Sequence, residues 1–231
     1  MQLSFGEYHL LGIYLLDIYR SCNIGIFARA NDTCVLVPLG LARTKMEKIA
    51  EFLDVKIVGV SIGGSRLVGP LVAMNDNGIL VSKLADDDEI ASLKHETGMH
   101  VERLESRYTS VGNMVAANDK GAIISGTFSR ETAARISEVL RVPVRQISLA
   151  SYIQAGSMIT TTSSGALVHP LGSEMELKVI SETLKVDVEP GTVNNGVPFV
   201  SSGIIANNKA AVVGSLTRGP ELMILARALK L

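Results

Sequence analysis

The strongest constraint on this chain is an internal repeat of about 44 residues. In each copy, small or apolar residues lead into a polar turn, and an apolar run follows the turn. The copies span residues 29–37, 73–81, 116–124, 160–168 and 205–213. The residue after the turn is Cys34, Gly78, Gly121, Gly165 or Ala210, so successive copies lie 44, 43, 44 and 45 residues apart. Because so short a unit cannot enclose its own core, the five copies must pack against one another.

Each copy predicts a β-hairpin that is followed by a helix and a further strand. Polar turns rich in Asn and Asp tolerate positive φ, and β-branched residues flank them. Capping signals predict helix starts near Thr44, Asp86, Ser129, Ser173 and Gly219. Thr44, Asp86 and Ser173 are each followed three residues later by Glu, which is the capping-box pattern. Strands are expected after the first four helices, at 56–60, 101–104, 144–147 and 186–188.

Five such units close naturally into a ring, in which each unit covers its neighbour's apolar surface. The fifth helix has no strand after it, whereas an apolar segment at 13–19 precedes the first hairpin. We therefore predict that this N-terminal strand completes the last unit. The fold class is then α/β, with one domain over 13–231 and an N-terminal extension over 1–12, either genuine or the product of a mis-assigned start.

Composition excludes several classes of protein. Hydrophobic residues make up 47% of the 231 residues and mean hydropathy is +0.29, which excludes a disordered chain. Charged residues are only 19% with a net charge of −1, which is untypical of a coiled coil or a basic DNA-binding module. No apolar run approaches the roughly 18 residues of a membrane span. Two cysteines are too few for a disulfide framework and suit the reducing cytoplasm.

A ring of five strand-strand-helix-strand units resembles the pentein fold, or five-bladed β/α-propeller. Five motifs indicate one family within this fold, and their order and spacing are more specific than any single motif. They are SIGGSRLVG at 61–69, GN at 112–113, LVHP at 167–170, GTVN at 191–194 and GPEL at 219–222. Together they resemble the archaeal-type translation initiation factor 6 family, from about Leu15 to Leu231.

This resemblance implies a function without catalysis or cofactor. Members of the family bind the large ribosomal subunit near ribosomal protein uL14 and the sarcin–ricin loop of ribosomal RNA. There they prevent premature joining of the small subunit, and they take part in large-subunit maturation. The resemblance therefore implies a cytoplasmic ribosome-binding factor, and a closed ring has no need to dimerise. Basic residues are interleaved with acidic ones, so we expect contact with ribosomal RNA to be peripheral.

The segments that enter each hairpin form the candidate ribosome-binding face. They are small and polar, with one charge among them, and suit docking against another protein's backbone. The candidate residues are Asn23, Gly25, Arg66, Gly112, Asn113, Ser157, Asn194 and Ser202. The alternative is that their Gly and Asn residues only permit tight turns around a crowded central channel. Which face of the ring docks stays open at this point.

Enzymatic interpretations are weaker. Pentein hydrolases and amidinotransferases use a Cys nucleophile, a His and carboxylates, and the nucleophile usually lies near the C-terminus. Here both thiols, Cys22 and Cys34, belong to the first repeat, and Cys34 takes a position that Gly or Ala fills elsewhere. His95 and His100 are five residues apart, whereas a zinc-protease helix needs four. We therefore predict neither catalysis nor a bound metal.

Overall fold

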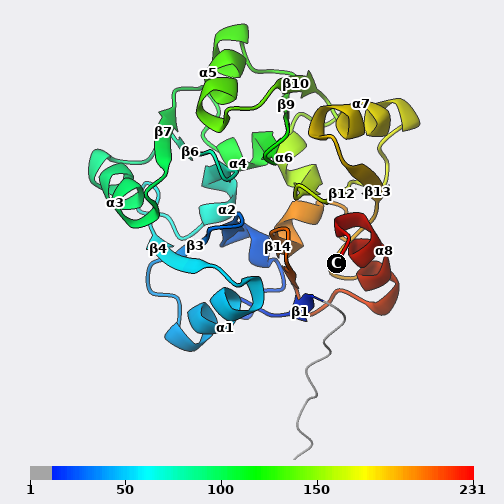
Figure 1. Ribbon diagram of the computed structural model, residues 1–231, viewed down its shortest axis with the longest axis horizontal. Helices are drawn as coiled ribbons and strands as arrows, with labels where there is room; N and C mark the ends of the chain where they lie inside the picture. Colours follow the sequence, from blue (N-terminus) through cyan, green and yellow to red (C-terminus); the bar gives the residue numbers. More distant parts are fainter. Residues whose placement is uncertain (1–11) are drawn as a thin grey trace, which may run out of the picture.

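The computed structural model describes residues 12–231, so the predicted extension lies, but for Gly12, outside the described residues. Figure 1 shows five blades around a central axis, with long helices at the periphery and short ones near the centre. Each blade is a three-stranded sheet, as the pentein fold requires. The predicted α/β ring is confirmed.

Three sets of strands build the blades. The inner strands are β2 (Arg29–Ala30), β5 (Val72–Met74), β8 (Val115–Ala117), β11 (Ile159–Thr161) and β14 (Ile204–Ala206). The middle strands are β3 (Cys34–Pro38), β6 (Gly78–Ser82), β9 (Ala122–Ser125), β12 (Gly165–Val168) and β15 (Ala211–Val213). The outer strands are β4 (Lys56–Val60), β7 (His100–Leu104), β10 (Val144–Ile147), β13 (Asp187–Pro190) and β1 (Ile13–Leu15). In every blade the inner strand pairs antiparallel and the outer strand parallel with the middle strand.

Two sets of helices complete the blades. The long helices are α1 (Arg43–Leu53), α3 (Asp87–Thr97), α5 (Arg130–Leu140), α7 (Glu174–Leu184) and α8 (Gly219–Leu229). The short helices are η1 (Ile24–Ile26), α2 (Val68–Leu71), α4 (Val111–Met114), α6 (Ala155–Met158) and η2 (Val200–Gly203). The short helices occupy segments that the sequence predicts as loops.

The N-terminal strand closes the ring, as the repeat predicts. β1 pairs parallel with β15, placing Ile13 opposite Ala211 and Leu15 opposite Val213. The Ala211 N–H also donates to the Gly12 carbonyl at 2.8 Å. The fifth blade thus combines β1 with α8, and its core contains Ile13 together with Leu225 and Leu229 of α8.

The helix starts follow the capping signals in four of the five blades. Asp86 and Ser173 form full capping boxes with Glu89 and Glu176, and the Ser129 side chain caps α5. The helix predicted to start near Thr44 begins one residue earlier, at Arg43, but the predicted capping box does not form, because Ala42 is the N-cap and has no side-chain cap. There the buried Leu41, whose N–H donates to the Pro38 carbonyl, sets the turn into the helix.

The topology gives the ring two different ends. The middle and outer strands run parallel away from the hairpin turns, and the Leu39 N–H donates to the Val60 carbonyl where both strands finish. The short helices and the loops before them therefore lie at one end, which we call the short-helix face. The hairpin turns lie at the other end, which we call the turn face.

Candidate functional site

The short helices form a closed inner ring at the short-helix face, and glycine lets them approach one another. A Cβ on Gly25 would lie 2.0 Å from the Ser201 carbonyl oxygen, and one on Gly112 2.0 Å from that of Gly69. Gly25 and Gly112 are both buried. Of the two interpretations of these glycines, the geometry supports close packing around a crowded axis, so they shape the face without contributing side chains to it.

Asn113, Ser157 and Ser202 take equivalent positions in successive blades. Each is the third residue of a short helix, and each backbone N–H donates to a carbonyl three residues earlier at 3.0–3.1 Å. All three are partly exposed. These three predicted residues therefore do share one surface, and they present polar side chains around the axis.

Arg66 lies beside an aromatic pair on the same face. Its guanidinium carbon is 5.8 Å from the centre of the Tyr19 ring, within cation–π range. Tyr19 in turn meets Phe27 edge to face, with ring centres 5.2 Å apart. Arg66 and Tyr19 are both exposed. This predicted basic anchor thus projects from an apolar base that sequence reasoning missed.

Asn194 and Asn23 meet where the fifth blade contacts the first. The Asn194 side-chain amide donates to the Cys22 carbonyl at 2.9 Å and to Asn23 Oδ1 at 3.3 Å. Asn194 Oδ1 accepts the Thr217 hydroxyl at 3.2 Å. Because Asn194 is buried and fully engaged, it positions the loop that carries the partly exposed Asn23.

The loops before the short helices are tied down by glutamates of the long helices. Glu221 accepts the Asn195, Gly196 and Arg218 N–H groups at 2.8–3.0 Å and the Thr192 hydroxyl at 2.7 Å. Burial alone would raise the pKa of Glu221, but these hydrogen bonds outweigh it and lower that pKa. Glu89 binds the Gly63 and Gly64 N–H groups in the same way. The face is therefore pre-organised.

Large exposed apolar side chains gather on the short-helix face. Among residues 12–231, nine such side chains are exposed, and seven belong to loops of this face: Tyr19, Leu39, Leu67, Leu84, Tyr152, Leu171 and Leu216. Met175 and Met223, the other two, lie in the first halves of α7 and α8. Four of the leucines fall five or six residues after repeat positions 34, 78, 165 and 210, which is the sequence signal that could have identified them.

Tyr152 belongs to a second aromatic cluster. Its ring meets that of Phe199 edge to face at 5.7 Å and that of His169 at 6.0 Å. His169 is buried, and burial lowers its pKa. The Leu171 N–H donates to His169 Nδ1 at 3.1 Å, which leaves the other ring nitrogen to carry the proton of the neutral ring. His169 therefore supports the exposed Tyr152 and Leu171.

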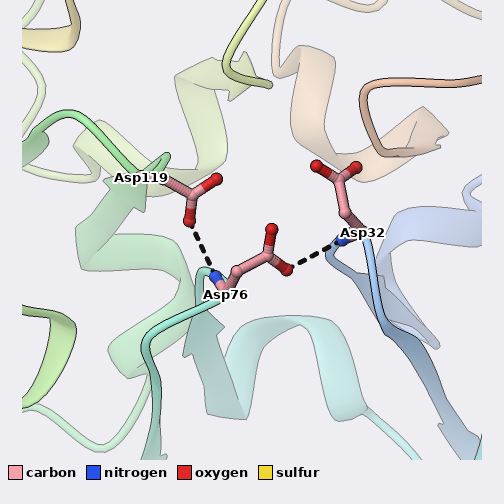
Figure 2. A group of neighbouring side chains, drawn as sticks. All are labelled: Asp32, Asp76 and Asp119. Atoms are coloured by element: carbon pink, nitrogen blue, oxygen red, sulfur yellow. Dashed lines mark hydrogen bonds between the residues drawn. The ribbon is translucent and has the colours of Figure 1, made fainter.

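The turn face has the opposite character, because its polar side chains bind one another. Figure 2 shows Asp32, Asp76 and Asp119 at neighbouring hairpin turns. The Asp32 N–H donates to Asp76 Oδ1 at 3.0 Å, and the Asp76 N–H to Asp119 Oδ1 at 2.8 Å. Burial, together with the charges of Asp119 and Asp32, raises the pKa of Asp76 to about 6. These carboxylates link adjacent blades.

Potential ligand atoms of the three aspartates lie within 4.8 Å of one another, which the sequence did not predict. The Asn-Asp pairs in three aligned turns were the available signal. Both oxygens of Asp119 and of Asp32 already accept hydrogen bonds from neighbouring turns. The three carboxylates therefore hold the hairpin turns of adjacent blades together.

The thiols offer little to catalysis. Cys34 is buried in β3, and burial raises the pKa of its thiol to about 11, so it stays protonated at neutral pH. Cys22 is partly exposed in the loop before η1. Within the described residues, neither thiol lies in a group of His, Cys, Asp and Glu close enough to hold a metal.

The family model described as the eIF-6 family matches residues 13–228. The chain belongs to the eIF-6 family. Translation initiation factor 6 of Nitrosopumilus maritimus is 51% identical to it over 218 residues, covering 94% of this chain and 99% of the relative. That of Thermococcus gammatolerans is 48% identical over 219 residues, covering 93% and 96%. Membership supports a role as an initiation factor in protein biosynthesis.

Solved structures give a more distant likeness. The N-terminal domain of ArgZ, solved covalently bound to a reaction intermediate, matches 71% of this chain and 68% of its own, with a TM-score of 0.49 and 13% identity. The eIF-6 family assignment rests on the sequence matches.

No helix among residues 12–231 is long and apolar enough to cross a membrane.

Proposed function

We propose that the protein binds the large ribosomal subunit through its short-helix face and prevents premature association with the small subunit. It acts by occupying a surface, so no bond is made or broken and no cofactor takes part. The same binding would serve large-subunit maturation and translation initiation in the cytoplasm. Membership of the eIF-6 family and the asymmetry of the ring support this proposal.

The observation that carries the proposal is the gathering of exposed apolar side chains at one end of the ring. Large apolar side chains exposed together on a monomer mark an interaction surface. Tyr19 and Tyr152 are 41% and 45% exposed, and Leu171 is 73% exposed. Tyr and Arg are enriched among residues that dominate binding energy, and Arg66 lies against Tyr19. The face thus combines apolar contact area with a cationic anchor.

We propose ribosomal protein uL14 as the main contact and the sarcin–ricin loop of ribosomal RNA as a peripheral one. Asn113, Ser157 and Ser202 supply neutral polar groups near the axis, which suits a protein backbone better than phosphate. A net charge of −1 also favours protein over RNA as the main contact, because phosphate binding needs clustered Lys and Arg. A monomer, with no DNA or membrane partner, is sufficient for this function.

Sedimentation through a sucrose gradient with isolated archaeal large and small subunits tests the proposal. We expect the protein to comigrate with the large subunit and to reduce subunit joining. Asn113→Arg and Arg66→Glu should each weaken binding about tenfold or more, because each introduces a mismatched charge into the contact.

Lys185→Glu is the matched control, because it reverses an exposed charge near the turn face, where the Lys185 carbonyl accepts the Lys120 ammonium at 3.5 Å. It should leave binding unchanged, and all three variants should unfold at nearly the wild-type temperature. Comigration that survives both substitutions on the short-helix face but is lost in Lys185→Glu would contradict the assigned face. A protein that neither comigrates nor reduces joining would contradict the function.

A further inference from the structure

The central channel contains a small, partly open polar cavity that the proposed function does not use. Its volume is about 60 Å³, and residues of the five inner strands line it together with Ala28 and Gly156. Pairing with the middle strands places one residue of each inner strand at the same level. These are Arg29, Ala73, Ala116, Thr160 and Ile205, opposite Leu36, Leu80, Ile123, Leu167 and Val212. The two small alanines leave room at the level that Arg29 and Thr160 share.

Arg29 brings a positive charge into the channel without a carboxylate partner among the described residues. Its Nε donates to the Gly69 carbonyl at 3.2 Å, Nη1 to Ser201 Oγ at 2.6 Å and Nη2 to the Gly112 carbonyl at 3.2 Å. Burial lowers the pKa of Arg29 to about 10, so the group remains charged at neutral pH. Three of its five N–H groups are thereby satisfied, and all three acceptors are neutral.

Thr160 contributes a second unsatisfied group to the same cavity. Its Oγ1 atom is buried and has no hydrogen-bond partner in the described part of the chain. The next residue differs, because the Thr161 hydroxyl donates to the Thr162 carbonyl at 3.0 Å. A buried hydroxyl without a partner costs free energy, so the cavity favours an occupant that accepts a hydrogen bond from Thr160.

We propose that this cavity binds a small monovalent anion of the size of chloride, held by Arg29 and Thr160. A buried charge needs a partner of opposite sign, and residues 12–231 supply only neutral acceptors to this guanidinium. A halide accepts from both N–H and O–H donors, and about 60 Å³ accommodates an ion that is little larger than a water molecule.

The charges at the other end of the channel define where the anion lies. Asp32, Asp76 and Asp119 line the adjoining cavity at the turn face, which shares Met74 and Thr161 with this one. Their negative charge repels an anion from that end, whereas the guanidinium attracts it. The halide therefore belongs at the level of Arg29, between the inner ring of short helices and the turn face.

Crystals of the full chain, purified and grown in sodium bromide with chloride omitted, test the position directly. We expect an anomalous peak for bromide, or for retained chloride, within hydrogen-bond distance of the Arg29 guanidinium and Thr160 Oγ1. Density that fits water alone, with no anomalous signal from either halide in the cavity, would overturn the proposal.

Thermal unfolding tests the same site in solution. At constant ionic strength, exchanging gluconate for bromide should raise the Tm of the wild type by about 3–6 °C for each tenfold increase in bromide above the dissociation constant. Thr160→Val should move the onset of that rise to a higher bromide concentration while large-subunit binding is retained. Thr183→Val removes a hydroxyl that bonds within α7 and should leave the onset unchanged. The same onset for wild type and Thr160→Val would overturn the site.

Discussion

Replacing Asp76 with Asn should stabilise the ring at neutral pH. Asp76 lies between Asp32 and Asp119 at the turn face, and its pKa is raised to about 6 from an ordinary value of 3.8. Holding it ionised therefore costs free energy in the folded state. Asn keeps the Oδ1 atom that accepts the Asp32 N–H at 3.0 Å, so the substitution removes the charge and retains the hydrogen bond.

The expected gain follows from the size of the pKa shift. A rise of about two units corresponds to about 3 kcal/mol, and solvent at the partly exposed turn reduces this to about 1–2 kcal/mol. Because the folded pKa is raised, this penalty is absent below the unfolded pKa and grows as pH rises towards the folded pKa. The advantage of Asp76→Asn should thus be complete at pH 7.5 and about a third as large at pH 4.5.

Urea unfolding of wild type and Asp76→Asn at these two pH values measures the effect. Asp88→Asn is the control, because it removes the same charge from an exposed position in the first turn of α3. That control should change stability by less than about 0.5 kcal/mol at either pH. Destabilisation of Asp76→Asn by the same amount at both pH values would refute the electrostatic reasoning and leave a lost contact as the cause.

Two further predictions concern the short-helix face. Gly112→Ala should cost about 3 kcal/mol in urea unfolding, because the new Cβ would lie 2.0 Å from the Gly69 carbonyl oxygen, whereas Gly219→Ala, with open space around it, should be tolerated. Glu221→Gln should lower stability by about 1–2 kcal/mol at pH 7. Since the folded pKa of Glu221 is lowered, that difference should shrink as pH falls below the ordinary Glu value of 4.5; a difference that stays constant as the pH is lowered further would contradict the assignment.

The repeat predicted the architecture because hairpins and capping boxes are local signals. Turn chemistry located all five hairpins, and the missing last strand predicted the pairing of β1 with β15. The short helices escaped prediction, because four residues such as 111–114 carry no helical periodicity. Contacts between blades stabilise them, and those contacts depend on the closed ring.

The repeat also predicts which of the candidate residues lie together. Asn113, Ser157 and Ser202 share one surface because they occupy one position of the repeat. The sequence predicts Gly25 at the binding surface, but the residue is buried, because η2 approaches it closely and no single repeat encodes that approach. Arg29 was missed, although the aligned repeats have Ala, Thr or Ile at its position, and that departure was visible in the sequence.

The two faces of the ring argue for docking on one side only. At the turn face, Asp32, Asp76 and Asp119 bind neighbouring turns, so their hydrogen bonds are already made within the ring. At the short-helix face, apolar side chains such as Tyr19 and Leu171 remain exposed. Two loops of the same face are held by Glu89 and Glu221, which accept the Gly63 and Gly196 N–H groups. Because those loops are held in place before binding, association costs little conformational entropy. A partner therefore gains apolar contact at the short-helix face and would have to break existing bonds at the turn face.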